Sequence, residues 1–96
     1  MVAMSTLTDA EITAGLAALP GWSREGDEIV KTFDCGTFPG AVAFVVRIGF
    51  FAEKADHHPD LDVRWKRVRV ALSTHDAGGL TTKDLDLARE IEGIGV

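Results

Sequence analysis

The sequence predicts a single α+β domain in which helices cover one face of a four-stranded antiparallel sheet. Apolar residues recur with helical spacing near both ends and in the middle of the chain, and two pairs of strand-like segments lie between these regions. The resulting order, α-β-β-α-β-β-α, is typical of an antiparallel sheet with its helices on one side. A chain of 96 residues fits one such domain, so residues 1–96 are expected to fold as one unit.

A capping box predicts the start of the first helix, because Glu11 stands three residues after Thr8. Apolar residues then recur on one face until Pro20-Gly21 ends the helix. Two short strands are expected next, over residues 22–25 and 28–33, joined as a hairpin.

A long helix is expected from Phe38 to about Ala55, and its apolar residues nearly encircle the axis. A helix that is apolar on most sides is buried on most sides. In so small a domain the sheet covers only one of them. We therefore expect a second subunit on another side, in a homodimer or a homotetramer.

The hydrophobic period changes to strand-like alternation after His57-His58-Pro59. Residues 68–72 predict a half-buried strand, and residues 61–66 its antiparallel partner, with a turn near Lys66-Arg67. One long strand across both segments fits the sequence as well. The last helix is expected to follow Thr81, with Asp84 at the third helical position completing a second capping box.

The charge balance excludes several classes of partner. A net charge of −5 argues against nucleic acid and anionic membranes, which both require clustered positive charge. The one basic run, residues 64–69, is interpreted as a solvated strand face and hairpin tip, with an anion-binding or protein-docking ridge as the alternative. The most apolar stretch of the chain, residues 41–52, is too short to span a bilayer. The first residues lack the features of a signal peptide. A lone cysteine, Cys35, cannot form an internal disulfide, so a cytoplasmic location is expected.

The candidate chemistry lies in three histidines, His57, His58 and His75, which all fall at junctions between elements. Junctions display functional side chains, and imidazole can accept and donate protons near neutral pH. Any one of these histidines, taken alone, also fits an idle solvated residue. Adjacent histidines tend to point apart, and the chain has neither paired cysteines nor a His-x-x-x-His spacing, so we expect no metal site.

Two motifs make the chain resemble the pterin-4a-carbinolamine dehydratases. They are Glu53-Lys-Ala-Asp-His57-His58-Pro59 and Ser73-Thr74-His75-Asp76-Ala77-Gly78-Gly79-Leu80-Thr81-x-x-Asp84, with an aromatic residue, Trp65, between them. Leu19-Pro20-Gly21-Trp22 is similar to the family's usual end of its first helix, so the likeness covers nearly the whole chain. Two positions depart from the family's pattern: Trp65 replaces a common tyrosine and Lys66 a common asparagine, changes that could alter pocket shape or hairpin geometry.

The resemblance implies an activity without a cofactor: removal of water from 4a-hydroxytetrahydropterin to give the quinonoid dihydropterin. This reaction recycles the tetrahydropterin cofactor of aromatic amino-acid hydroxylases. It implies that His57 and His75 act as the acid–base pair, in either order, and that His58 contacts and orients the ring.

The resemblance also implies a set of substrate-binding residues: Glu53, His57, His58, Pro59, Thr74, His75, Asp76, Ala77 and Asp84. Glu53 fits either an orienting partner of an imidazole or a solvated side chain. We rank the capping role of Asp84 above a role in the site. Members of the family also serve as protein partners, including a dimerisation cofactor of a transcription factor. The alternative prediction is therefore a pterin-binding or assembly module.

Overall fold

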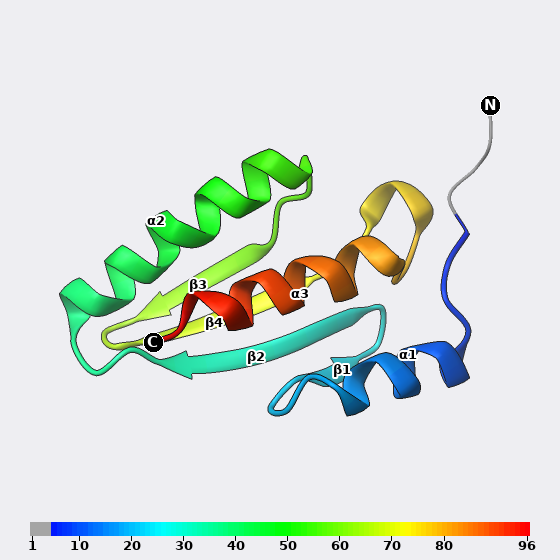
Figure 1. Cartoon of the computed structure of the whole chain (residues 1–96), viewed down its shortest axis with the longest axis horizontal. Coiled ribbons are helices and arrows are strands. Elements are labelled where there is room, and N and C mark those ends of the chain that lie inside the picture. Colours follow the sequence, from blue (N-terminus) through cyan, green and yellow to red (C-terminus); the bar gives the residue numbers. More distant parts are fainter. Residues whose placement is uncertain (1–4) are drawn as a thin grey trace.

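The computed structural model describes residues 5–96 and confirms the predicted order of the elements (Figure 1). The one addition is a short 3₁₀ helix, His75–Ala77, before the last helix. The elements are α1 (Asp9–Ala17), β1 (Ser23–Glu25), β2 (Glu28–Asp34), α2 (Phe38–Ala55), β3 (Asp60–Arg64), β4 (Arg67–Leu72) and α3 (Thr82–Ile94).

The four strands form one antiparallel sheet in the order β1-β2-β4-β3, so the two predicted hairpins meet at β2 and β4. Ile29 pairs with Leu72 and Phe33 with Val68. All four side chains are buried in the core, because alternate residues of a strand point to the same face. Residues of all three helices belong to the same core, so the helices share this face of the sheet (Figure 1).

Each helix contributes one buried stripe to the core. In α2 it consists of Ala41, Phe44, Ile48 and Ala52, at helical spacing. Helix α1 packs closely on α3 at Gly15, where a Cβ atom would lie 2.6 Å from Leu85 Cδ1. A larger residue at this position would therefore force the Leu85 side chain to shift.

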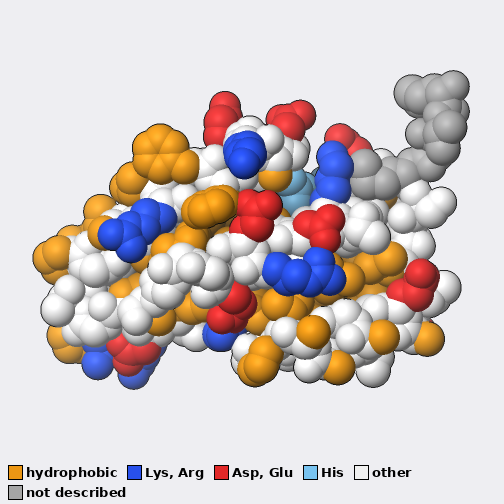
Figure 2. Space-filling model, viewed as in Figure 1, with side chains coloured by type: hydrophobic (Ala, Val, Ile, Leu, Met, Phe, Trp, Pro, Cys, Tyr) orange, Lys and Arg blue, Asp and Glu red, His pale blue; other side chains and the backbone are white. Residues whose placement is uncertain are grey.

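The opposite side of α2 is exposed. Phe38, Val42, Val46 and Phe50 recur every four residues, and Phe50 is 73% exposed. Figure 2 shows hydrophobic side chains gathered over this helix. The sheet therefore covers one side of α2 only, and the rest of its apolar surface faces outward in the single chain. None of the helices in residues 5–96 has the length and hydropathy needed to cross a bilayer.

The β3–β4 hairpin consists of two strands, which excludes the single long strand that the sequence also allowed. Its turn lies at Trp65-Lys66, one residue earlier than expected, and Trp65 has a left-handed φ of 54°. The neighbouring basic residues make ion pairs on the surface: Arg64 with Asp62 at 2.9 Å, Lys66 with Asp34 at 3.6 Å, and Arg69 with Glu25 at 2.8 Å. The basic run is thus a solvated strand face and hairpin tip, as its sequence predicts.

Candidate active site

The end of α2 positions the first two histidines. Asp56 adopts a left-handed conformation, with φ 49°, and ends the helix. The backbone N–H of His57 then donates to the Ala52 carbonyl at 3.0 Å, which closes the last turn. Because the helix stops here, the Glu53 carboxylate lies 3.0 Å from His58 Nε2 and not against His57. Both members of this Glu53–His58 pair are exposed.

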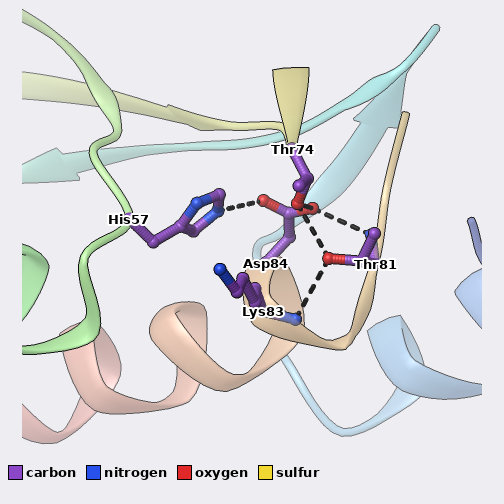
Figure 3. Close-up of polar contacts among 5 residues, drawn as sticks. All are labelled: His57, Thr74, Thr81, Lys83 and Asp84. Atoms are coloured by element: carbon purple, nitrogen blue, oxygen red, sulfur yellow. Dashed lines mark hydrogen bonds and ion pairs between the residues drawn. The ribbon is translucent and has the colours of Figure 1, made fainter. Parts of the chain in front are cut away.

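His57 instead turns inward to meet Asp84 in the first turn of α3 (Figure 3). His57 Nε2 lies 2.6 Å from Asp84 Oδ1; His57 is 8% exposed and Asp84 is fully buried. An ionised carboxylate only accepts hydrogen bonds, so Nε2 must carry a proton and donate it. The other ring nitrogen, Nδ1, takes no part in this contact, so it can exchange a proton with a bound molecule.

Two threonines fix the second oxygen of Asp84. Thr74 Oγ1 donates to Asp84 Oδ2 at 2.8 Å, and the Thr81 backbone N–H donates to it at 2.9 Å. The single hydroxyl hydrogen of Thr74 is already donated to Asp84. In the 2.8 Å contact between Thr74 Oγ1 and Thr81 Oγ1, Thr81 is therefore the donor. Thr81 Oγ1 in turn accepts the Lys83 backbone N–H at 3.3 Å (Figure 3). These hydrogen bonds, together with that of His57, fix the orientation of the Asp84 carboxylate.

The third histidine is presented by the loop between β4 and α3. Thr74 and Gly79 form an isolated bridge, with the Thr74 N–H donating to the Gly79 carbonyl at 3.0 Å. The short helix His75–Ala77 lies inside this closed loop, and Gly78 ends it with φ 77°, a conformation that favours glycine. His75 is consequently exposed at the start of a tightly bridged loop.

The two junctions meet at one pocket of about 190 Å³. This is below the roughly 300–1,000 Å³ typical of drug-sized ligands, and suits a small ring system. The pocket is lined by Asp56, His57, His58, Ser73, Thr74, His75, Asp76 and Lys83.

Five of the nine predicted substrate-binding residues line this pocket, the three histidines with Thr74 and Asp76. The other four are not among its lining residues. Asp84 lies beneath it as the partner of His57, Glu53 holds His58 from outside, and Pro59 and Ala77 are half-buried neighbours. Trp65 does not line the pocket either; it is 71% exposed at the hairpin turn.

The pocket also contains three lining residues that were not predicted from the sequence, Asp56, Ser73 and Lys83. Each is adjacent in sequence to a residue that was singled out, namely His57, Thr74 and Asp84. Adjacency alone is a weak signal, because consecutive side chains often point in different directions. Within residues 5–96, no three histidine, cysteine or acidic side chains are grouped so as to hold a metal ion.

Comparison with known proteins identifies relatives over the whole domain. The profile of the family described as pterin 4 alpha carbinolamine dehydratase matches residues 5–94. A protein of Roseiflexus castenholzii is 59% identical over 88 residues, which cover 92% of this chain and 95% of the relative. A protein of Chloroflexus aurantiacus is 56% identical over 91 residues, covering 95% and 98%. Both are provisionally named pterin-4-alpha-carbinolamine dehydratase.

The fold has a counterpart among solved structures as well. A crystal structure described as transcriptional coactivator/pterin dehydratase from Brucella melitensis superposes with a TM-score of 0.91 and is 34% identical, covering 96% of this chain and all of that one. The matching profile, the near-complete coverage of relatives at over half identity and the shared fold agree with one another. The chain therefore belongs to the pterin 4 alpha carbinolamine dehydratase family.

Proposed function

We propose that this protein removes water from 4a-hydroxytetrahydropterin and releases the quinonoid dihydropterin. The observation that carries the proposal is that His57 and His75, from two separate junctions, line one small pocket in a member of this family. In this proposal the protein acts in the cytoplasm, where it recycles tetrahydropterin for aromatic amino-acid hydroxylases. It needs neither a metal nor a cofactor.

The proposed reaction requires one proton to be given and one to be taken. The lone pair of N5 forms the C4a=N5 double bond while the C4a–O bond breaks. One imidazole protonates the departing hydroxyl, which leaves as water, and the other accepts the proton of N5–H. Two histidines on one pocket can supply this pair, and a positioned acid or base typically contributes about 10²–10⁴-fold each.

Asp84 supports this chemistry from below the pocket. Its hydrogen bond keeps the proton of His57 on Nε2, so that Nδ1 is the nitrogen that exchanges protons with the substrate. His58, on the exposed rim and paired with Glu53, is assigned to contact and orient the ring.

The decisive experiment measures the dehydration of enzymatically generated 4a-hydroxytetrahydropterin with and without the protein. We expect a clear acceleration that survives treatment with a metal chelator. No acceleration over the spontaneous reaction would contradict the proposed function, and a chelator-sensitive rate restored by zinc would contradict the metal-free mechanism.

The second candidate function is that of a protein-assembly module. The exposed apolar stripe of α2, Phe38, Val42, Val46 and Phe50, favours it, because an apolar patch of this kind marks an interaction surface. The relative from Brucella melitensis is described as a transcriptional coactivator as well as a dehydratase. A protein that associates through α2 but leaves the dehydration rate unchanged would support the assembly module over the enzyme.

A further inference from the structure

Lys83 stands where the local electrostatics of the fold disfavour a cation. It is the second residue of α3, and the N-terminus of a helix carries a partial positive charge that repels a positive side chain. Its ammonium makes no ion pair with a carboxylate of residues 5–96. Neither helix stability nor a neighbouring acid therefore explains a lysine at this position.

Lys83 is part of the candidate active site. Lys83 lines the same pocket as His57 and His75, and Figure 3 shows its side chain extending from α3 towards the His57 ring. The other residues with full charges on this pocket are two exposed acids, Asp56 and Asp76. Lys83 thus supplies the pocket with a group that donates hydrogen bonds and cannot accept them.

We propose that Lys83 donates a hydrogen bond to the C4 carbonyl oxygen of the pterin and so selects a ring that carries an acceptor at this position. This inference rests on the proposed function. C4 is bonded directly to C4a, and C4a carries both the 4a-hydroxyl and N5, so a donor to the C4 oxygen must lie beside a histidine of the acid–base pair, whichever role that histidine has. The placement of Lys83 next to His57 meets this requirement.

The remaining charges of the pocket fit the same edge of the ring. Beyond the C4 oxygen, the pterin edge continues with the N3–H and the 2-amino group, which are both donors. The carboxylates of Asp56 and Asp76 offer acceptors to such donors on the same pocket. An ammonium and carboxylates together therefore match an edge that alternates from acceptor to donors.

Two fluorescent ligands separate this role from a general effect of charge. Pterin has a carbonyl oxygen at C4, whereas 2,4-diaminopteridine has an amino group there, which would meet the ammonium with a second donor. Fluorescence titration at a pH where both rings are uncharged should show that the wild-type protein binds pterin more tightly, by about tenfold or more, the effect of one hydrogen bond to a charged donor.

Variants of the lysine should change this preference in a defined order. Lys83→Met should lose it, through weaker binding of pterin, and Lys83→Arg should keep most of it. Lys83→Glu should reverse it, because a carboxylate accepts from the 4-amino group. The matched control is Lys54→Met, an exposed lysine of α2 that does not line the pocket, which should bind both ligands as the wild type does.

The stability of the variants distinguishes binding from folding. Removing a cation from a helix N-terminus should leave the melting temperature of Lys83→Met unchanged or slightly raised. A wild-type preference that persists in Lys83→Met would overturn the role of Lys83 while leaving the proposed dehydratase intact. A wild-type protein that binds neither ligand and does not accelerate dehydration would overturn both proposals.

Discussion

The Asp84 carboxylate has two roles, one in capping α3 and one in holding His57. It completes the capping box of α3 through the Thr81 N–H, and it holds the His57 ring at 2.6 Å. A fully buried charge is costly unless it is hydrogen-bonded, and here three donors satisfy it. The sequence favours the capping role of Asp84 over a role beside the histidines, but the geometry allows both. Oδ2 accepts from the Thr81 N–H of the cap, and Oδ1 faces His57.

Replacing Asp84 with asparagine should separate these tasks. The amide oxygen can still accept from Thr81 and Thr74, but its NH₂ group would face His57 and donate to Nε2. The neutral ring must then carry its proton on Nδ1, so this nitrogen can neither accept a proton from the substrate nor readily give up its own, whichever role His57 has. We expect Asp84→Asn to lower the single-turnover dehydration rate by at least about tenfold. A variant that is destabilised but turns over normally per folded molecule would show that the cap is the only role.

Alanine at the two proposed acid–base histidines should give the same kinetic defect and different stabilities. His57→Ala and His75→Ala should each lower the rate by at least about tenfold. His75 is exposed, so its loss should cost little stability. His57, unlike His75, is buried. Its loss leaves Asp84 Oδ1 without a donor, which should lower the free energy of unfolding by about 1–3 kcal/mol. Single-turnover rates and thermal unfolding measure both effects, and full rates in both variants would refute the site.

At the scale of elements, the capping boxes at the starts of α1 and α3 set where these helices begin. Thr8 and Glu11 bond each other reciprocally, and so do Thr81 and Asp84. The first box lies on the surface, where the donated Thr8 N–H lowers the pKa of Glu11 below its ordinary value of 4.5. A carboxylate whose pKa is lower in the folded state stabilises the fold above its unfolded pKa, and the effect is lost as pH falls through the folded pKa.

Acid should therefore remove the advantage of Glu11 over a neutral isostere. Glu11→Gln keeps an oxygen that can accept from Thr8 but has no charge to titrate. The wild type should have the higher urea midpoint at pH 7, and the gap should narrow as the pH falls below about 4.5. Glu90→Gln, at an exposed position of α3, is the control. A gap that stays constant down to pH 3 would show that the charge of Glu11 contributes nothing.

At the scale of the whole molecule, the outer side of α2 is an apolar surface that no other element within residues 5–96 covers. Its apolar side chains are exposed in the single chain, and burial of apolar area is the main force that drives association. The uncovered face of the sheet, by contrast, carries charged pairs such as Arg69–Glu25. The helix is therefore the better candidate for a contact between subunits.

We expect at least a homodimer in sedimentation equilibrium at micromolar concentration. Val46, 53% exposed, lies in the middle of the α2 stripe, so Val46→Glu should shift the protein to a smaller species. Thr32→Glu, on an exposed strand position, should leave the assembly unchanged and serves as the control. A wild-type protein that sediments only as a monomer would contradict the prediction.

Local sequence patterns are sufficient to predict the elements and their order. Capping boxes and the hydrophobic period act over a few neighbouring positions, so Thr8 and Thr81 mark helix starts wherever the chain goes afterwards. The end of the first helix is less well predicted: α1 ends at Ala17, before Pro20-Gly21. The family motifs also singled out the three histidines. The turn at Trp65-Lys66 was misplaced by one residue because neither residue has the usual preference for a left-handed position.

Contacts between these residues, by contrast, could not be predicted from local patterns. His57 and Asp84 are 27 residues apart, and their contact depends on the left-handed turn at Asp56 and on the packing of α2 beside α3. The same packing brings His75 and Lys83 to one pocket and leaves Glu53 with His58. Periodicity fixes which face of an element is apolar, whereas contacts between side chains depend on how the elements pack, and that is set by the fit of the whole core.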